Sequence, residues 1–167
     1  MTRWIALLRG INLGARNRVS MPELRTQLAA LGYEDVATVV QSGNIVLGST
    51  ATAAQLARDL QRVVSDGFGV DTPVVVRSAA QLAKVVADNP LPVPDGTRFQ
   101  VLFFAERPAA AGLEDIGEER LVVRGREIYC WHPDGLQRSP LARKLDRVEG
   151  VATARNWNTV LKLNDLA

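Results

Sequence analysis

The chain has 167 residues, of which 47% are hydrophobic, so it is long enough to bury a sizeable core without disulfides or metal ions. Its 20 basic and 18 acidic side chains give a net charge of +2, which excludes a polybasic nucleic-acid coat protein. One cysteine and one histidine exclude an internal disulfide and a four-ligand zinc site, and no apolar run reaches about 18 residues. We therefore expect a cytoplasmic α/β protein with no metal site and no membrane partner.

The first half of the chain alternates predicted strands and helices. Residues 4–8 form a continuous apolar run, which is typical of a buried central strand. Leu24, Leu28 and Leu31 then share one face of a helix that ends at Gly32. Further strands are predicted at residues 36–41, 44–47 and 73–77, and capping boxes that predict helix starts lie at Ser20–Glu23, Thr52–Gln55 and Ser78–Gln81. Because only residues 42 and 43 separate two of these strands, we expect a two-residue hairpin there.

This β-α-β-β-α-β order is the ferredoxin-like pattern, and one more helix follows it. Three prolines within residues 90–94 predict a linker over residues 90–97. The pattern then resumes, with strands at residues 99–105, 121–123, 127–131 and 151–154, and with helices near 109–113, from Ser139 onward and over 157–166. We therefore expect an α/β (α+β) fold of two tandem ferredoxin-like βαββαβ units, residues 1–89 and 98–167.

Residues 9–18 form the first of three polar stretches that could bind a ligand. They include three arginines, two asparagines and two glycines, and no acidic residue. The stretch leaves a strand and approaches a helix start, where the helix dipole adds positive potential. Arg9, Asn12 and the backbone near Gly14 could therefore hold an anion. The alternative is a surface loop with solvated arginines. The spacing of Gly10 and Gly14 matches neither the Walker A motif, which needs Gly-Lys-Ser/Thr, nor the Gly-x-Gly-x-x-Gly motif of dinucleotide-binding folds.

The second and third stretches are residues 41–44 and 155–159. A tight turn explains Ser42 and Gly43, while Gln41 and Asn44 could offer their amides to a ligand. In the third stretch Asn156 is a predicted helix cap, and Trp157 is either a core anchor or a stacking platform beside Arg155. The candidate ligand-binding residues are Arg9, Gly10, Asn12, Gly14, Gln41, Ser42, Gly43, Asn44, Arg155, Asn156, Trp157, Asn158 and Thr159.

The sequence offers few groups for nucleophilic or acid–base catalysis. Cys130 and His132 share a face of a predicted strand and could form a thiolate–imidazole pair. A cysteine in an apolar strand is more typical of a buried hydrophobic residue, and we expect His132 to be exposed because a turn follows it. The carboxylate pairs at residues 114–115 and 118–119 are expected on a solvated face. The residues therefore identify neither a reaction nor a cofactor, and both stay unknown at this point.

Five stretches of the chain occur together in one order: residues 6–14, 21–25, 41–44, 75–79 and 153–160. In this combination the chain resembles, from about Trp4 to its C-terminus, the bacterial family described as domain of unknown function 1697. The resemblance implies two ferredoxin-like units and no known activity, and the family's signature stretches map onto the three polar stretches. The chain departs from the family at Ala15, Val39 and Leu47, where a second glycine and two aromatic residues are usual. A shared stacking role in the first unit is therefore not expected.

The polar stretches favour a binding protein or an enzyme for a small anionic ligand, such as a nucleotide or another phosphate compound. Arg9 and Arg155 would supply charge and the amides would supply hydrogen bonds. This hypothesis requires the three stretches to converge on one pocket in which the guanidinium groups lack carboxylate partners. One alternative is a nucleic-acid-binding module, which the near-neutral charge and the absence of the aromatic sheet motif disfavour. The other is an interaction or scaffold protein, in which the polar stretches are caps and internal hydrogen bonds.

Overall fold

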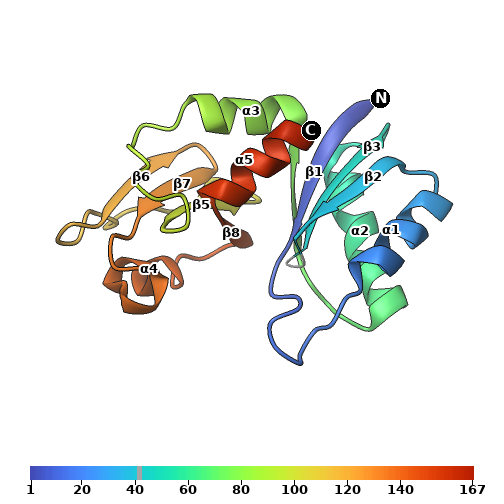
Figure 1. The fold of residues 1–167 in the computed structure, drawn as a ribbon, viewed down its shortest axis with the longest axis horizontal. Coiled ribbons are helices and arrows are strands. Elements are labelled where there is room, and N and C mark those ends of the chain that lie inside the picture. The colour runs from blue at the N-terminus through green and yellow to red at the C-terminus, as the bar shows by residue number, and fades with distance from the viewer. Residues whose placement is uncertain (41–42) are drawn as a thin grey trace. The chain divides into compact units, whose positions relative to one another are not determined.

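The computed structural model describes residues 1–40 and 43–167 (Figure 1). They form a mixed α+β fold with two four-stranded antiparallel sheets. The contacts divide the chain into two units, which we describe separately: unit 1 is Met1–Lys84 with Lys162–Ala167, and unit 2 is Val85–Leu161. The sequence predicts a linker at residues 90–97, whereas the contacts divide the chain within helix α3 (Ala79–Ala87).

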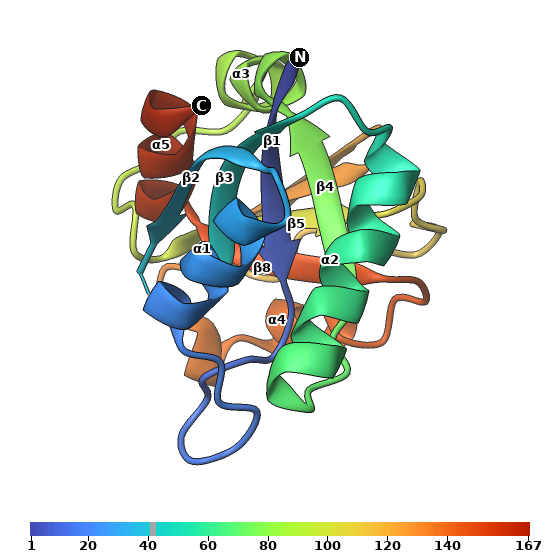
Figure 2. The same ribbon diagram turned by 90° about the vertical axis from the view of Figure 1, so that its right-hand side faces the viewer.

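Unit 1 has the element order that the sequence predicts. Its elements are β1 (Thr2–Leu8), α1 (Met21–Ala30), β2 (Glu34–Val39), β3 (Asn44–Ser49), α2 (Ala53–Phe68) and β4 (Val74–Ser78), and α3 follows directly. The strands pair in the order β2-β3-β1-β4. Helices α1 and α2 lie on the same face of this sheet (Figure 2). Strand β1 is therefore central, as its continuous apolar run predicts.

The core of unit 1 lies between this face of the sheet and the two helices. Alternate residues of β1 face the helices, whose buried leucines recur at helical spacing. Leu31, predicted on the buried stripe of α1, is instead 62% exposed, because α1 ends at Ala30 and Leu31 is its C-cap. The buried face of α1 therefore includes Leu24 and Leu28, as predicted, but not Leu31.

Strand β2 ends at Val39, two residues before the end that the sequence predicts. Its pairing with β3 ends at Val39 and Asn44, and the predicted turn falls partly on Gln41 and Ser42, which lie outside the described residues. Gly43 has a φ of 83°, and a Cβ there would lie 2.7 Å from the Cβ of Leu8. Both the backbone conformation and the close packing therefore require glycine at this position.

Unit 2 repeats the strand order of unit 1 with a different set of helices. Its sheet is β6-β7-β5-β8, which is again second-third-first-fourth along the chain. The elements are β5 (Phe99–Phe104), β6 (Arg120–Arg124), β7 (Glu127–Trp131), a 3₁₀ turn (Leu136–Arg138), α4 (Pro140–Leu145), β8 (Ala152–Asn156) and α5 (Trp157–Leu166). The second half of α5, from Lys162, is assigned to unit 1. In the part of the chain that the structure describes, no helix is both long and apolar enough to cross a bilayer.

The helix predicted near residues 109–113 is wrong, because this segment has no helical turns in the structure. Pro108 precedes it, Gly112 has a φ of 83°, and Gly117 has a φ of 57°. These residues favour turns over a continuing helix, and the alanines between them supply no amphipathic stripe to pack. Unit 2 therefore has a loop where the predicted βαββαβ order places its first helix.

Candidate functional site

The first polar stretch lies in the loop between β1 and α1, which we call the arginine loop (residues 9–19). It extends beyond the end of the unit 1 sheet (Figure 2). The Asn12 carboxamide donates to the carbonyl oxygen of Val19 (2.9 Å) and accepts from its amide (2.8 Å). The Asn17 carboxamide donates to the carbonyl oxygen of Gly10 (3.1 Å), and its backbone carbonyl accepts from the Asn12 amide (3.0 Å). The backbone of the loop is therefore held by its own side chains.

The arginine loop carries three exposed side chains of positive charge: Arg9, Arg16 and Arg18. Arg18 donates from Nη1 to the carbonyl oxygen of Gly14 (3.1 Å). Within residues 1–40 and 43–167, none of the three guanidinium groups forms an ion pair with a carboxylate. Gly10 and Gly14 both have a φ near that of a left-handed helix, 67° and 65°, which fits the turning role predicted for them.

The base of the arginine loop is tied to the segment before strand β4 by Thr72. The Thr72 hydroxyl donates to the carbonyl oxygen of Arg9 (2.6 Å) and accepts from its amide (3.1 Å). The adjacent Asp71 carboxylate accepts a hydrogen bond from Gln61 of α2 (2.9 Å). Gly43 lies at the same end of the sheet, because its carbonyl oxygen accepts from the last amide of β1 (2.8 Å). The structure therefore brings the first stretch and the described part of the second together.

Two of the predicted ligand amides are used inside unit 1. Asn12 braces the arginine loop through both of its side-chain polar atoms. Asn44 is fully buried and donates its carboxamide to the carbonyl oxygen of Val39 (2.9 Å). The candidate residues Gln41 and Ser42 lie outside the described residues. Of the candidate residues of unit 1 that the structure describes, the exposed charged one is therefore Arg9, which shares the loop with Arg16 and Arg18.

The third stretch belongs to unit 2, and its residues have structural roles there. The Asn156 side-chain oxygen accepts from the Thr159 amide (2.9 Å), as expected of a helix cap. Trp157 is 9% exposed and meets Phe99 edge-on, with ring centroids 5.4 Å apart. An edge-to-face aromatic pair of this kind stabilises a core. Of the two interpretations of Trp157, the structure therefore supports the core anchor.

Arg155 belongs to unit 2, and 8% of its surface is exposed in the folded chain. Its Nη1 donates to Thr153 Oγ1 (2.6 Å) and to the carbonyl oxygen of Ala154 (2.8 Å), and burial lowers the pKa of the guanidinium to about 10. The Asn158 carboxamide lies against Gly96, where a Cβ would collide with it. Because the three stretches are divided between the two units, their convergence on one pocket stays a prediction.

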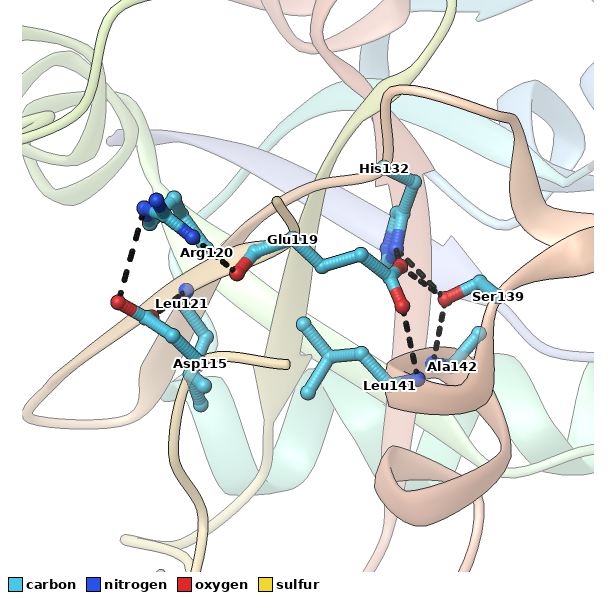
Figure 3. Close-up of polar contacts among 8 residues, drawn as sticks. All are labelled: Asp115, Glu119, Arg120, Leu121, His132, Ser139, Leu141 and Ala142. Carbon is cyan, nitrogen blue, oxygen red and sulfur yellow. Dashed lines mark hydrogen bonds and ion pairs between the residues drawn. The ribbon is translucent and has the colours of Figure 1, made fainter. Parts of the chain in front are cut away.

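Unit 2 contains a buried polar cluster formed by Glu119, His132 and Ser139 (Figure 3). His132 Nδ1 donates to Glu119 Oε2 (2.7 Å), and the Ser139 hydroxyl donates to the same oxygen. The Leu141 amide donates to Glu119 Oε1 (3.1 Å), and the Ala142 amide donates to Ser139 Oγ (2.8 Å). One carboxylate thus joins the start of β6, the residue after β7 and the first turn of α4.

The hydrogen bonds of this cluster keep Glu119 ionised. Burial alone would raise the pKa of the Glu119 carboxyl, but the hydrogen bonds from Ser139, His132 and Leu141 outweigh burial and lower that pKa. Bonds to a carboxylate are stronger than bonds between neutral groups. The cluster therefore fixes the N-terminus of α4 against the sheet of unit 2.

The arrangement differs from a serine–histidine–acid nucleophile. Ser139 Oγ lies 2.9 Å from His132 Nδ1, the nitrogen that also contacts Glu119. In a catalytic triad the serine and the acid lie on opposite ring nitrogens. His132 Nε2 is buried and has no hydrogen-bond partner among the residues that the structure describes, and Ser139 is 1% exposed. We therefore assign the cluster a structural role.

Two sequence-based expectations about these residues are wrong. His132 was expected to be exposed and Glu119 to be solvated, yet they are 1% and 8% exposed. The His132 amide donates to the carbonyl oxygen of Arg98 (3.0 Å), which extends the sheet beyond β7, and a bridge between Ile116 and Glu119 turns the chain inward. Cys130 lies in the apolar core, where burial raises the pKa of its thiol, so its interpretation as a buried hydrophobic residue is confirmed.

The sequence contains some signals for the cluster. The only histidine follows an apolar strand directly, and Ser139 precedes a proline at a helix start. These signals identify the helix cap but not its partner, because Glu119 lies 20 residues before Ser139 and reaches it only in the folded unit.

The chain is similar to proteins of one family. The family model described as protein of unknown function DUF1697 matches residues 1–129. The solved structure of the conserved bacterial protein SP0830 from Streptococcus pneumoniae is 26% identical, covers 99% of this chain and 98% of its own, and superposes with a TM-score of 0.74. A comparison with curated proteins gives no match. Because the family model covers more than half of its residues, the chain belongs to the DUF1697 family of proteins of unknown function.

Proposed function

We propose that the protein binds a small phosphate-bearing anion, such as a nucleotide, at the arginine loop. The observation that carries this function is the set of three exposed guanidinium groups, of Arg9, Arg16 and Arg18, on one short loop of fixed backbone. Guanidinium groups form bidentate, charge-assisted hydrogen bonds with phosphate oxygens.

The bracing of the loop supports the same function. A ligand that orders a mobile loop loses affinity, whereas a loop already held by Asn12 and Asn17 needs less ordering on binding. The start of α1, at the end of the loop, adds the positive end of a helix dipole. The net charge of only +2 fits a local anion site better than a general affinity for polyanions.

We confine the site to the arginine loop because the third stretch is used inside unit 2. Arg155 donates to Thr153, and Trp157 packs on Phe99. We also propose binding rather than catalysis, because Cys130 lies in the apolar core of unit 2, where its thiol is not accessible to a ligand.

A melting screen tests this function. Pyrophosphate, nucleotides and sugar phosphates are added to the wild-type protein, to the triple variant Arg9→Ala/Arg16→Ala/Arg18→Ala and to the control Arg58→Ala, an exposed arginine of α2. A ligand at 100 times its Kd adds about 2.7 kcal/mol of stability, or roughly 5–10 °C for a chain of this size. We expect this stabilisation in the wild type and the control and its loss in the triple variant. Unchanged melting across the panel, or equal stabilisation of the triple variant, contradicts the proposal.

A nucleic acid is the second candidate ligand, since the loop extends beyond the sheet (Figure 2) and its arginines are exposed. A projecting loop can reach the phosphates of a polymer as well as a free nucleotide. Binding to single-stranded RNA that weakens steeply with salt would favour this candidate. If single-stranded RNA does not bind at low salt while pyrophosphate stabilises the protein, the ligand is a small anion and not a nucleic acid.

Two further points about the whole chain remain proposals of the same kind. We propose that both units are ferredoxin-like, a view supported by the shared strand order, with a loop in unit 2 in place of the first helix. A cytoplasmic location stays a prediction.

A further inference from the structure

The arginine loop carries one large apolar side chain that the fold does not bury. Leu13 is 68% exposed, whereas Ile11 and Val19 of the same loop are buried in the core of unit 1. Two of the loop's apolar residues therefore hold it to the unit, and the third remains in contact with solvent.

The backbone of the loop fixes the place of Leu13. Leu13 pairs with Arg16 across a two-residue turn, in which Gly14 has a φ of 65°. The preceding residue, Asn12, is held to Val19 by two hydrogen bonds of 2.8 and 2.9 Å. Single exposed leucines are common on protein surfaces. This one differs because it lies on a braced turn among basic side chains.

The charges that surround Leu13 all have the same sign. Arg9, Arg16 and Arg18 are exposed, and residues 9–19 include no acidic side chain. In the part of the chain that the structure describes, no carboxylate forms an ion pair with these three guanidinium groups. The loop therefore presents an apolar side chain and positive charge together.

A second exposed apolar residue lies at the same end of unit 1. Val40 is 52% exposed and follows Val39, which pairs with Asn44. Asn44 also pairs with Leu7, close to the end of β1 from which the arginine loop leaves. Exposed apolar surface at this end of the sheet is therefore not confined to Leu13.

An anionic lipid surface has the chemistry that complements this end of unit 1. Its head-group phosphates attract guanidinium groups, and the acyl boundary beneath them accepts an apolar side chain. A soluble polyanion such as RNA matches the charges but provides no apolar layer for an exposed leucine. The loop extends beyond the end of the unit 1 sheet, which leaves its turn accessible to a broad surface (Figure 2).

We propose that the arginine loop docks on an anionic membrane surface, with Leu13 inserted among the lipids and the arginines bound to head-group phosphates. This inference rests on the proposed function, because it assigns the phosphate at the arginine loop to a lipid head group. The contact is peripheral. The expectation of no membrane partner rests on the length of the apolar runs, which concerns spanning segments and not a contact of this kind.

Sedimentation with lipid vesicles at about 0.1 M salt tests the docking. Vesicles of equal parts phosphatidylcholine and phosphatidylserine are compared with vesicles of phosphatidylcholine alone. We expect the wild-type protein to bind the anionic vesicles with half-saturation at about 1 mM lipid, and the neutral vesicles at least about tenfold more weakly.

Three variants separate the apolar contribution from the charged one. Leu13→Ser should weaken binding to the anionic vesicles about tenfold, because it removes the inserted side chain. Arg9→Ala/Arg16→Ala/Arg18→Ala should weaken it about 100-fold, at roughly fivefold for each guanidinium group. The control Leu31→Ser replaces a leucine that is 62% exposed at the other end of α1, and it should leave binding unchanged.

Pyrophosphate distinguishes failure of this inference from failure of the proposed function. Leu13→Ser keeps all three arginines, so pyrophosphate should raise its melting temperature as much as that of the wild type, which also shows that the variant is folded. Stabilisation of the wild type by pyrophosphate without binding to vesicles would overturn the membrane contact and keep the anion site. The absence of both effects would overturn both proposals. Equal binding of wild type and Leu13→Ser to anionic vesicles would show that charge alone makes the contact, as with a nucleic acid, and would also overturn the membrane docking.

Discussion

Replacing Glu119 by glutamine should destabilise the protein strongly although the side chain keeps its size. The carboxylate accepts hydrogen bonds from Ser139, His132 and Leu141. Bonds to a charged acceptor contribute about 1.5–3 kcal/mol each and neutral ones about 0.5–1.5 kcal/mol. In Glu119→Gln two bonds become neutral, and the new amide N–H₂ faces a third donor, which loses its partner at a cost of about 1–3 kcal/mol. We expect a total loss of about 3–5 kcal/mol at pH 7.

Urea unfolding followed by circular dichroism measures this loss. With a slope of about 1–3 kcal/mol/M, the midpoint should fall by roughly 1–5 M. The control is Glu118→Gln, an exposed neighbour, which should change stability by no more than about 0.5 kcal/mol. An effect of Glu119→Gln as small as that of the control would refute the structural role of the cluster.

The pH dependence gives a second readout of the same prediction. The folded pKa of Glu119 lies below its ordinary value of 4.5, so its ionisation stabilises the protein above that pH. This stabilisation is lost as the pH falls through the folded pKa. The difference in free energy of unfolding between wild type and Glu119→Gln should therefore be largest at pH 7 and should decrease below pH 4.5. A difference in free energy of unfolding that increases with falling pH would contradict the stabilising role of ionised Glu119.

Three further predictions concern single residues in both units. Gly43→Ala places a Cβ 2.7 Å from that of Leu8 at a positive φ, so it should lower the free energy of unfolding by about 2–4 kcal/mol. The control is Gly125→Ala, which also has a positive φ but open space around it, and it should lower the free energy of unfolding by about 1 kcal/mol. Urea unfolding midpoints of the two variants measure the difference. Asn12→Ala removes two hydrogen bonds that brace the arginine loop, so it should lower the melting temperature and weaken pyrophosphate binding in calorimetry. The Cys130 thiol, buried and of raised pKa, should react with iodoacetamide only after unfolding, and rapid native-state labelling would contradict its burial.

The helix starts of unit 1 could be predicted because their determinants are local. A capping box joins residues three apart, and the structure has the reciprocal hydrogen bonds of Thr52 with Gln55 and of Ser78 with Gln81. The apolar run of β1 likewise predicts a central strand without knowledge of its partners. These patterns are sufficient for the element order of unit 1.

The helix expected near residues 109–113 shows where local propensity fails. Three consecutive alanines have a high helix propensity, but a run this short is not stable without an amphipathic face to pack. Gly112 instead adopts a φ of 83°, which favours a turn. Tertiary packing, and not the preference of the alanines, determines the structure of this segment.

The residues of the candidate sites were predictable to different degrees. The arginine loop is continuous in sequence, so its charge and its lack of acidic residues are visible directly. The roles of Asn12 and Asn44 depend on which backbone groups they reach in the fold, and they proved structural. The burial of Glu119 and His132 depends on contacts between distant segments, which no local pattern contains.

The arginine side chains themselves give the most direct test of the anion site. NMR of the arginine Nε–H groups during titration with pyrophosphate reports on each guanidinium separately. We expect the signals of Arg9, Arg16 and Arg18 to move together with one Kd, while Arg58 stays in place. Movement of Arg58 alone, or no movement of the three loop arginines at saturating pyrophosphate, would show that this loop is not where the protein binds anions.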